Sequence, residues 1–174
     1  MHASLWNRWI QDMRMACVGQ SAVARIPVLL VLAYWGLRHM LDPEYTTLFA
    51  GINLGIHEAG HEVFRGAGEF LLAAGGTILQ CMAPLAAAGV FFRQKDYFAV
   101  SFALFWLADN LFSVAQYMGD ARALNLPRVS MERTIGWANG DPSGHDWHYM
   151  LRELGLLSAD RVLAGALRLG ACAL

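Results

Sequence analysis

Two long apolar stretches follow one another in the middle of the chain, and they limit the fold more than any other feature. Residues 70–92 include no charged side chain, and residues 97–118 include only Asp109. Both stretches exceed the roughly 20 apolar residues that a helix needs to cross a bilayer. The link between them, residues 93–96, is short and polar. The sequence therefore predicts an antiparallel pair of membrane helices.

Two further stretches are less apolar. Residues 26–41 carry polar side chains only near their end, and residues 48–64 become polar after Ile56. Each can cross a bilayer if its flanking polar side chains reach the interface. Hydrophobic residues make up 56% of the chain and charged residues 16%, against about 25% charged in soluble domains. We therefore expect an all-α fold, a polytopic membrane helical bundle with about four membrane helices.

A soluble bundle of wholly buried helices is the alternative fold. A run of 23 uncharged residues beside a second such run is hard to bury in a domain of 174 residues. This alternative is therefore disfavoured.

Both ends of the chain are less apolar than its middle. Residues 1–25 mix arginines with tryptophans and are predicted to form an amphipathic helix at the membrane surface. Residues 121–160 predict a cytoplasmic segment of loops with a short helix over residues 146–156. We expect residues 1–160 to form a single membrane-embedded domain. Residues 161–174 are expected to form a short apolar C-terminal helix that is interfacial or partly inserted.

The arginines and lysines predict how the chain is oriented. If four membrane helices alternate in direction, and Arg161 and Arg168 of the unplaced C-terminal segment are left out, eight basic residues fall on one side and three on the other. The larger group is Arg8, Arg14, Arg25, Arg65, Arg122, Arg128, Arg133 and Arg152, and the smaller is Arg38, Arg93 and Lys95. By the positive-inside rule the sequence predicts a multi-pass protein of the bacterial cytoplasmic (inner) membrane with a cytoplasmic N-terminus.

A zinc-binding pattern lies within residues 48–64. Residues 57–61 read His-Glu-Ala-Gly-His, which matches H-E-x-x-H. On a helix His57 and His61 share one face and can bind one metal ion between them. Glu58 lies beside them, where it can take a proton from a metal-bound water. The pattern predicts a Zn²⁺ site with His57 and His61 as ligands and Glu58 as the catalytic general base.

A catalytic zinc site needs a third protein ligand and an open position for water. Asp109, Ser113, Gln116 and Asp120 fall on one helix face, and a polar stripe in a membrane helix is costly unless it faces the bundle interior or water. The candidates for the third ligand are Asp109, Asp120, His145, Asp146 and His148. We prefer Asp120, where the stripe leaves the membrane, and His145, which follows a flexible Ser-Gly pair.

A family resemblance rests on these motifs. With His-Glu-Ala-Gly-His in an apolar helix followed by a helical hairpin, residues 48–156 resemble an integral-membrane zinc metallopeptidase of the site-2-protease type. They also resemble small bacterial membrane proteins with a later Gly-His-Asp-Trp, here residues 144–147. The family resemblance implies peptide-bond hydrolysis in or near the membrane.

The motif that supplies the third zinc ligand in this family has no match in this chain. In site-2 proteases this ligand is an aspartate in a Leu-Asp-Gly motif on a later membrane helix, whereas residues 107–110 here read Leu-Ala-Asp-Asn. The resemblance therefore carries over only to His57, Glu58 and His61.

Two other functions fit the same residues. One is a non-catalytic membrane protein or accessory subunit of a larger membrane complex, with a structural or vestigial metal site. The other is oxidative, because the histidines at 57, 61, 145 and 148 faintly resemble the histidine boxes of membrane di-iron hydroxylases, although those use more than the six histidines present here.

The charge balance limits the expected partners. The 13 basic and 14 acidic side chains nearly cancel, so no broad positive surface favours nucleic acid. The expected partners are the lipid bilayer, a membrane-protein or peptide substrate, and other membrane subunits.

Overall fold

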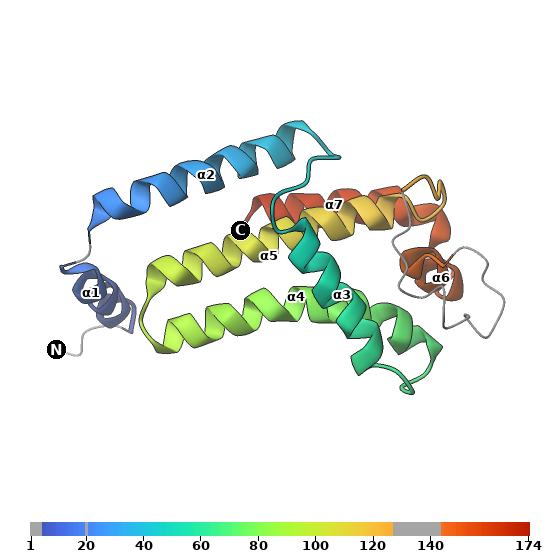
Figure 1. The fold of residues 1–174 in the computed structure, drawn as a ribbon, viewed down its shortest axis with the longest axis horizontal. Helices are drawn as coiled ribbons and strands as arrows, with labels where there is room; N and C mark the ends of the chain where they lie inside the picture. The colour runs from blue at the N-terminus through green and yellow to red at the C-terminus, as the bar shows by residue number, and fades with distance from the viewer. Residues whose placement is uncertain (1–4, 20, 127–143) are drawn as a thin grey trace.

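The computed structural model describes residues 5–19, 21–126 and 144–174, and all regular structure within them is helical (Figure 1). In chain order the elements are α1 (Leu5–Cys17), α2 (Ala22–Leu41), α3 (Ala50–Val63), α4 (Glu69–Arg93), α5 (Tyr97–Gly119), α6 (Asp146–Glu153), the 3-10 helix η2 (Leu157–Ala159) and α7 (Asp160–Cys172). The predicted all-α class is confirmed for these residues. The loops predicted over residues 127–143 lie outside the described residues.

α4 and α5 form the antiparallel pair expected from the two apolar stretches. α4 has 25 residues and α5 has 23, so at 1.5 Å per residue each is about 35 Å long and exceeds the hydrocarbon core of a bilayer, about 30 Å. Asp96 caps α5 by accepting a hydrogen bond from the backbone N–H of Ala99 at 3.1 Å. Among the described residues these two helices are long and apolar enough to cross a membrane.

The outer surface of this helix pair is apolar. Only 28% of the most apolar window of α4 and 44% of that of α5 are buried within the protein. The large apolar side chains that α4 leaves exposed are Phe70, Leu71, Ile78, Met82, Leu85, Val90 and Phe92. Such a surface is costly in water, whereas lipid would cover it. The exposure therefore fits a membrane-embedded pair.

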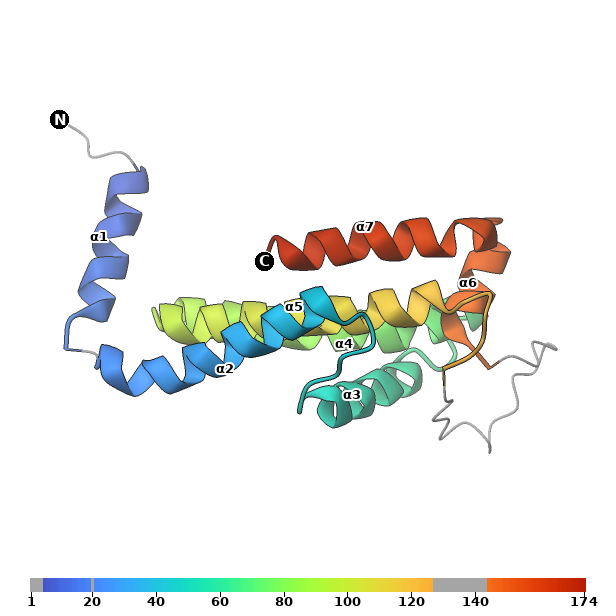
Figure 2. The ribbon, with the colours of Figure 1, turned by 90° about the horizontal axis from the view of Figure 1, so that it is seen from above.

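α2 and α3 do not form two further alternating crossings. α2 runs from the end that holds the α4–α5 link toward the opposite end, and α3 starts near the middle of the hairpin and runs toward that same opposite end (Figure 1 and Figure 2). α3 has 14 residues, about 21 Å, which is shorter than the bilayer core. The predicted bundle of about four spanning helices is therefore not confirmed. The physical reason is that the face of α3 that carries His57 and His61 is buried against α4, and the helix ends at Val63 instead of continuing across.

The N-terminal helix lies beside the link between α4 and α5. The predicted amphipathic helix is present as α1, and its Asp12 pairs with Lys95 of the link at 3.6 Å. Figure 2 shows α1 at this end of the hairpin, away from α6. The charge count had assigned the N-terminus and Lys95 to opposite sides, because it assumed four alternating crossings.

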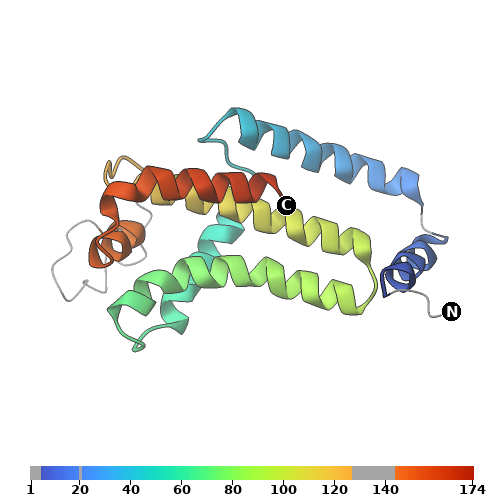
Figure 3. The ribbon, with the colours of Figure 1, turned by 180° about the vertical axis from the view of Figure 1, so that it is seen from behind.

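The packed core lies where α5, α6 and α7 meet, at the opposite end of the hairpin (Figure 3). Its buried members are Val114, Ala115, Met118, Ala121, Leu151 and Ala164. At the start of α7 the carboxylate of Asp160, 1% exposed, pairs with Arg122 at 2.7 Å. The predicted C-terminal helix is therefore a layer packed along α5, and its partial insertion into a membrane stays a prediction.

Candidate metal centre

α3 carries a row of polar side chains on the face that it buries. Asn53, His57 and His61 are four residues apart, which aligns them on one helix face. They are 3%, 9% and 7% exposed. Because buried polar groups need partners, the partner of each ring nitrogen decides what the two histidines can bind.

Glycines allow α3 to approach α4 closely enough to bury these rings. A methyl group at Gly60 would overlap the backbone carbonyl of Gly75, so the two helices touch at their crossing. A methyl group at Gly76 would lie 2.5 Å from Nε2 of His57, well inside the normal contact distance of about 3.5 Å. The glycine pair that interrupts an apolar stretch in the sequence therefore provides the space for the His57 ring.

The back of the His57 ring is held by Gln80 of α4. Nδ1 of His57 lies 3.0 Å from Oε1 of Gln80. Asn110 fixes the orientation of this amide, because its Oδ1 accepts from Nε2 of Gln80 at 2.9 Å and its Nδ2 donates to the Gln80 backbone carbonyl at 3.1 Å. The Gln80 oxygen is thus turned to His57, and Nδ1 carries the hydrogen. Nε2 then presents a lone pair, as a metal ligand must.

His61 is held in the same way by a backbone group. Its Nδ1 lies 2.7 Å from the carbonyl oxygen of Leu72 in α4. A carbonyl oxygen can only accept, so Nδ1 of His61 donates and Nε2 presents its lone pair. A hydrogen bond behind the ring is what orients metal-binding imidazoles in proteins.

Both Nε2 atoms point at one carboxylate oxygen, Oδ2 of Asp146 at the start of α6. The distances to it are 3.0 Å from His57 and 3.5 Å from His61. Three lone-pair atoms this close repel one another unless a cation lies among them, either a proton on a ring or a metal ion. Ligand atoms bound to a tetrahedral zinc ion at 2.0–2.1 Å are about 3.3 Å apart. The observed spacing fits an ion of that size, and all three ligand atoms lie within 4.8 Å of one another.

Asp146 enters this group as a carboxylate. Burial alone would raise its pKa, but without a metal ion a proton on Nε2 of His57 or His61 lies against Oδ2, and the resulting hydrogen bond and positive charge hold the pKa below its ordinary value. The hydroxyl oxygen of Tyr117 in α5 accepts a hydrogen bond from the backbone N–H of Asp146 at 3.1 Å. Tyr117 thereby fixes the start of α6 against α5, with the Asp146 side chain directed at α3.

A cavity of about 1040 Å³ is lined by these three residues and by Glu58. Glu58 is half-buried. Two arginines of the described residues, Arg65 and Arg122, pair with acids other than Glu58, Arg65 with Glu62 and Arg122 with Asp160. Glu58 therefore borders the same space as the centre, as a general base must.

The two preferred third ligands lie beside the centre and are engaged by nearby backbone. His145 caps α6, because its Nδ1 accepts a hydrogen bond from the backbone N–H of His148 at 3.1 Å, and burial lowers its pKa. Asp120 accepts hydrogen bonds from the backbone N–H groups of Asn125 and Leu126 at 2.9 and 3.0 Å. The two side chains approach each other to 3.8 Å. Neither joins the buried group around the two α3 histidines.

The remaining candidates also differ in their surroundings. Asp109 accepts three hydrogen bonds from side chains of α2, α3 and the loop between them. His148 donates from Nδ1 to the backbone carbonyl of Ala121 at 2.7 Å. Ser113 and Gln116 of the polar stripe line the cavity as expected. Of the five candidates, the structure brings Asp146 to both histidines.

Sequence reasoning assigned no role to Gln80, Asn110 or Tyr117. A signal was present for the first two, since both are polar residues inside apolar stretches, where a polar side chain is costly unless it has a partner. Tyr117 has the pattern of an interfacial aromatic residue, so only its contact with Asp146 reveals it.

The fold and the centre together define a class. Within the described residues the chain is a helical protein with two candidate membrane-spanning helices and a buried group of two histidines and one aspartate that could hold a metal ion. Comparisons with protein-family models, curated proteins and solved structures find no match to the chain. The function of the chain is therefore inferred from the geometry of the centre.

Proposed function

We propose that this chain is a membrane-embedded zinc-dependent peptidase of the site-2-protease type, with His57, His61 and Asp146 as ligands and Glu58 as general base. One observation carries the proposal. The Nε2 atoms of both histidines converge on Oδ2 of Asp146 while each ring is held at Nδ1 by an acceptor. Three protein ligands leave the fourth position of a tetrahedral centre for water.

The chemistry follows from the residues around this centre. Zinc, when bound, would act as a Lewis acid toward a peptide carbonyl and would lower the pKa of a water molecule. Glu58 accepts the proton of the attacking water and passes it to the leaving amine, so that water is added across the C–N bond. The cavity of about 1040 Å³ is at the upper end for ligand sites, about 300–1,000 Å³, which leaves room for a peptide segment.

We further propose that the chain is a multi-pass protein of the bacterial cytoplasmic membrane. Because α1 lies beside the α4–α5 link, the charge count that assumed four alternating crossings no longer fixes the side of the N-terminus. The length and apolar composition of α4 and α5 support two crossings. α2 has 20 residues and exposes Val23, Leu30 and Leu37, which supports a third. The short α3 gives no support to a fourth.

Glu58→Gln in the full-length protein tests the catalytic part of the proposal. The protein is reconstituted in liposomes with a mixture of single-span membrane proteins, and new peptide termini are identified by mass spectrometry. Glu58→Gln is expected to lower cleavage by about 10²–10⁴-fold and to keep its zinc, because Glu58 is not a ligand. Glu62→Gln is the matched control, since Glu62 is an exposed glutamate on the same helix. Undiminished cleavage by Glu58→Gln would contradict the proposal that this chain is a peptidase with Glu58 as its general base.

Metal analysis tests the centre separately from catalysis. We expect one zinc per native chain, and loss of that zinc in His61→Ala and in Asp146→Asn. A native protein that binds no metal would contradict the centre itself. Iron in place of zinc would favour the oxidative function, because two histidines and one carboxylate also form the ligand set of non-haem iron oxygenases.

A non-catalytic accessory subunit is the second candidate function. The observation that favours it is the large apolar surface of α2, whose exposed side chains include Ile26, Leu29 and Tyr34, because other membrane helices can pack on such a surface. Stoichiometric zinc with no cleavage of any substrate would support this function.

A further inference from the structure

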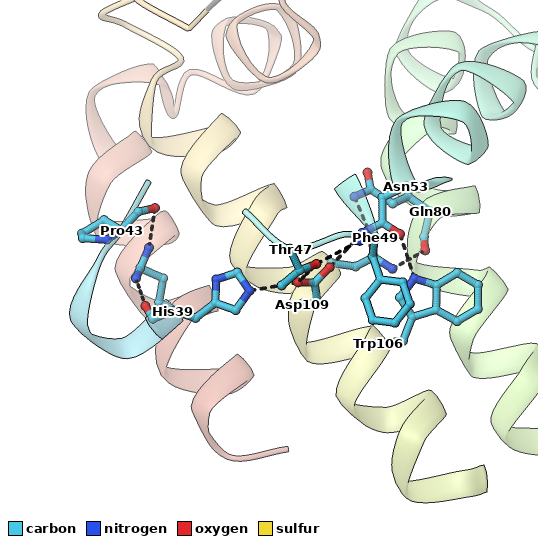
Figure 4. A network of polar contacts seen from close by, with 10 residues as sticks. His39, Pro43, Thr47, Phe49, Asn53, Gln80, Trp106 and Asp109 are labelled. Atoms are coloured by element: carbon cyan, nitrogen blue, oxygen red, sulfur yellow. Dashed lines mark hydrogen bonds and ion pairs between the residues drawn. The ribbon is translucent and has the colours of Figure 1, made fainter. Parts of the chain in front are cut away.

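A second buried polar cluster lies one helical turn before the centre along α3, and Asp109 of α5 is in its middle (Figure 4). Oδ1 of Asp109 accepts hydrogen bonds from Nε2 of His39 at 2.9 Å and from Oγ1 of Thr47 at 2.8 Å. Oδ2 accepts from Nδ2 of Asn53 at 2.9 Å, and Oδ1 of Asn53 accepts from the indole N–H of Trp106 at 2.7 Å. A buried network whose polar groups are satisfied holds its elements rigidly.

The donor His39 is itself fixed from two directions. Its ring stacks on Phe112 of α5 with ring centres 4.7 Å apart. Its backbone carbonyl accepts a hydrogen bond from Arg168 of α7 at 2.7 Å, and Arg168 also donates to the carbonyl of Pro43 at 3.3 Å. The end of α2 is therefore tied to both α5 and α7.

The cluster holds the first half of α3. No side-chain hydrogen bond caps the N-terminus of this helix. Thr47 accepts a hydrogen bond from the backbone N–H of Phe49 at 3.1 Å while it donates to Asp109. The chain entering α3 and the first turn of the helix, through Asn53, are thus both tied to one carboxylate.

The second half of α3 is held at the glycine crossing with α4, where Gly60 meets Gly75. His57 lies between these two places of attachment, one turn after Asn53 on the same face. If Asn53 lost its partner, α3 could roll about the glycine crossing. Such a roll would turn Nε2 of His57 away from Asp146.

We propose that Asp109 is a positioning residue for the metal centre, which sets the rotation of α3 through Asn53 and so aims His57 and His61 at Asp146. The inference rests on the proposed metal centre but not on peptidase activity. It accounts for a carboxylate inside a helix long enough to span a membrane, where an ionisable group is costly without a role. A carboxylate can accept all three hydrogen bonds, whereas an amide must turn its NH₂ toward one of the donors.

Asp109→Asn tests the inference through zinc affinity. The Kd for zinc is measured by competition with a chelator, and cobalt is used as a second probe because its visible spectrum reports ligand geometry. Asp109→Asn is expected to raise the zinc Kd by about 10–100-fold, as loss of groups that orient ligands does, and to change the cobalt spectrum. Asp96→Asn is the matched control on the same helix, because asparagine caps a helix as well as aspartate does.

An exchange of the two side chains separates positioning from a general loss of stability. In Asp109→Asn combined with Asn53→Asp, the amide at 109 accepts from His39 and Thr47 and donates to the carboxylate at 53, which also accepts from Trp106. The hydrogen-bond pattern is retained, so the double variant is expected to return the zinc Kd and the cobalt spectrum toward those of the native protein. A merely structural role would lower the Tm of the metal-free protein and leave the zinc Kd unchanged.

The outcomes distinguish this inference from the function on which it rests. If the native protein binds neither zinc nor cobalt, both the proposed metal centre and the positioning role of Asp109 are wrong. Native zinc binding with an unchanged Kd in Asp109→Asn overturns the positioning role alone. If Asp109→Asn does not fold, Asn53→Ala is measured instead, since it removes the hydrogen bond through which Asp109 holds α3. A several-fold rise in zinc Kd then supports the role, and no change overturns it.

Discussion

At the scale of single residues, Gln80 decides which nitrogen of His57 faces the centre. Gln80→Met keeps a similar volume but cannot hold Nδ1 of His57, so the imidazole is free to take its other tautomer and to turn. We expect the zinc Kd to rise by about 10–100-fold. Gln94→Met, at the exposed end of the same helix, is the control and is expected to bind zinc as the native protein does. An unchanged Kd in Gln80→Met would show that the ring is oriented by other contacts.

Gly76 leaves the space in which the His57 ring lies. In Gly76→Ala the new methyl group would meet Nε2, Cε1 and Cδ2 of His57 within 2.7 Å, so the ring must move. The zinc Kd is predicted to rise by at least about 10-fold. Gly89→Ala in the same helix meets nothing within 4 Å and is predicted to leave the Kd unchanged. Equal zinc affinity in both variants would show that His57 is not confined as described.

The sequence predicted the site residues that lie close together along the chain. His57 and His61 are four residues apart, and helix geometry alone aligns them. Asp146 comes from a segment far along the chain, and among the five candidates for the third ligand the sequence favoured Asp120 and His145 over it. The five candidates differ in the groups to which each side chain is already hydrogen-bonded. His145 caps α6, and Asp120 accepts hydrogen bonds from the turn after α5. Neither contact was predicted from the sequence.

At the scale of helices, the Asp160–Arg122 pair joins α7 to the end of α5 and predicts a pH dependence. The hydrogen bond from Arg122 lowers the pKa of Asp160, below the value of about 3.9 expected in the unfolded chain. The folded state therefore binds this proton less readily than the unfolded state. The pair stabilises the fold above about pH 4, and this contribution is lost as the pH falls through the lower, folded pKa.

Asp160→Asn measures that contribution. In detergent the variant is expected to have a lower Tm than the native protein near neutral pH, with the difference shrinking at acid pH. Glu153→Gln is the control, because Glu153 is exposed and its pair with Arg152 is exposed too, and such pairs contribute little. A Tm difference for Asp160→Asn that stays constant from neutral to acid pH would contradict the assignment of the effect to the Asp160 carboxylate.

The sequence predicted the helices whose extent follows from the length and composition of a segment. The two long apolar stretches form α4 and α5, and the amphipathic N-terminal segment forms α1. α3 was expected as a further crossing because its first half is apolar. The sequence does not show that its second half is buried by backbone contact between Gly60 and Gly75, since such a crossing depends on which helices meet.

At the scale of the whole molecule, the structure separates two ends of the hairpin. One end holds α1 and the α4–α5 link, joined by the Asp12–Lys95 pair, and the other holds α6 and the metal centre (Figure 1). If α4 and α5 cross the membrane, these ends lie on opposite sides of it. The alternating four-helix topology expected from charge instead puts Asp12 and Lys95 on opposite sides.

Single-cysteine labelling distinguishes these two arrangements. Asp12→Cys, Lys95→Cys and Arg152→Cys are each made in a chain whose native cysteines are replaced by alanine, and sealed vesicles are treated with a membrane-impermeant maleimide. All three positions are exposed. We expect positions 12 and 95 to react from one side and position 152 from the other. Reaction of position 12 together with 152 would restore the four-helix alternation, and reaction of all three from one side would mean that the α4–α5 hairpin does not cross the bilayer.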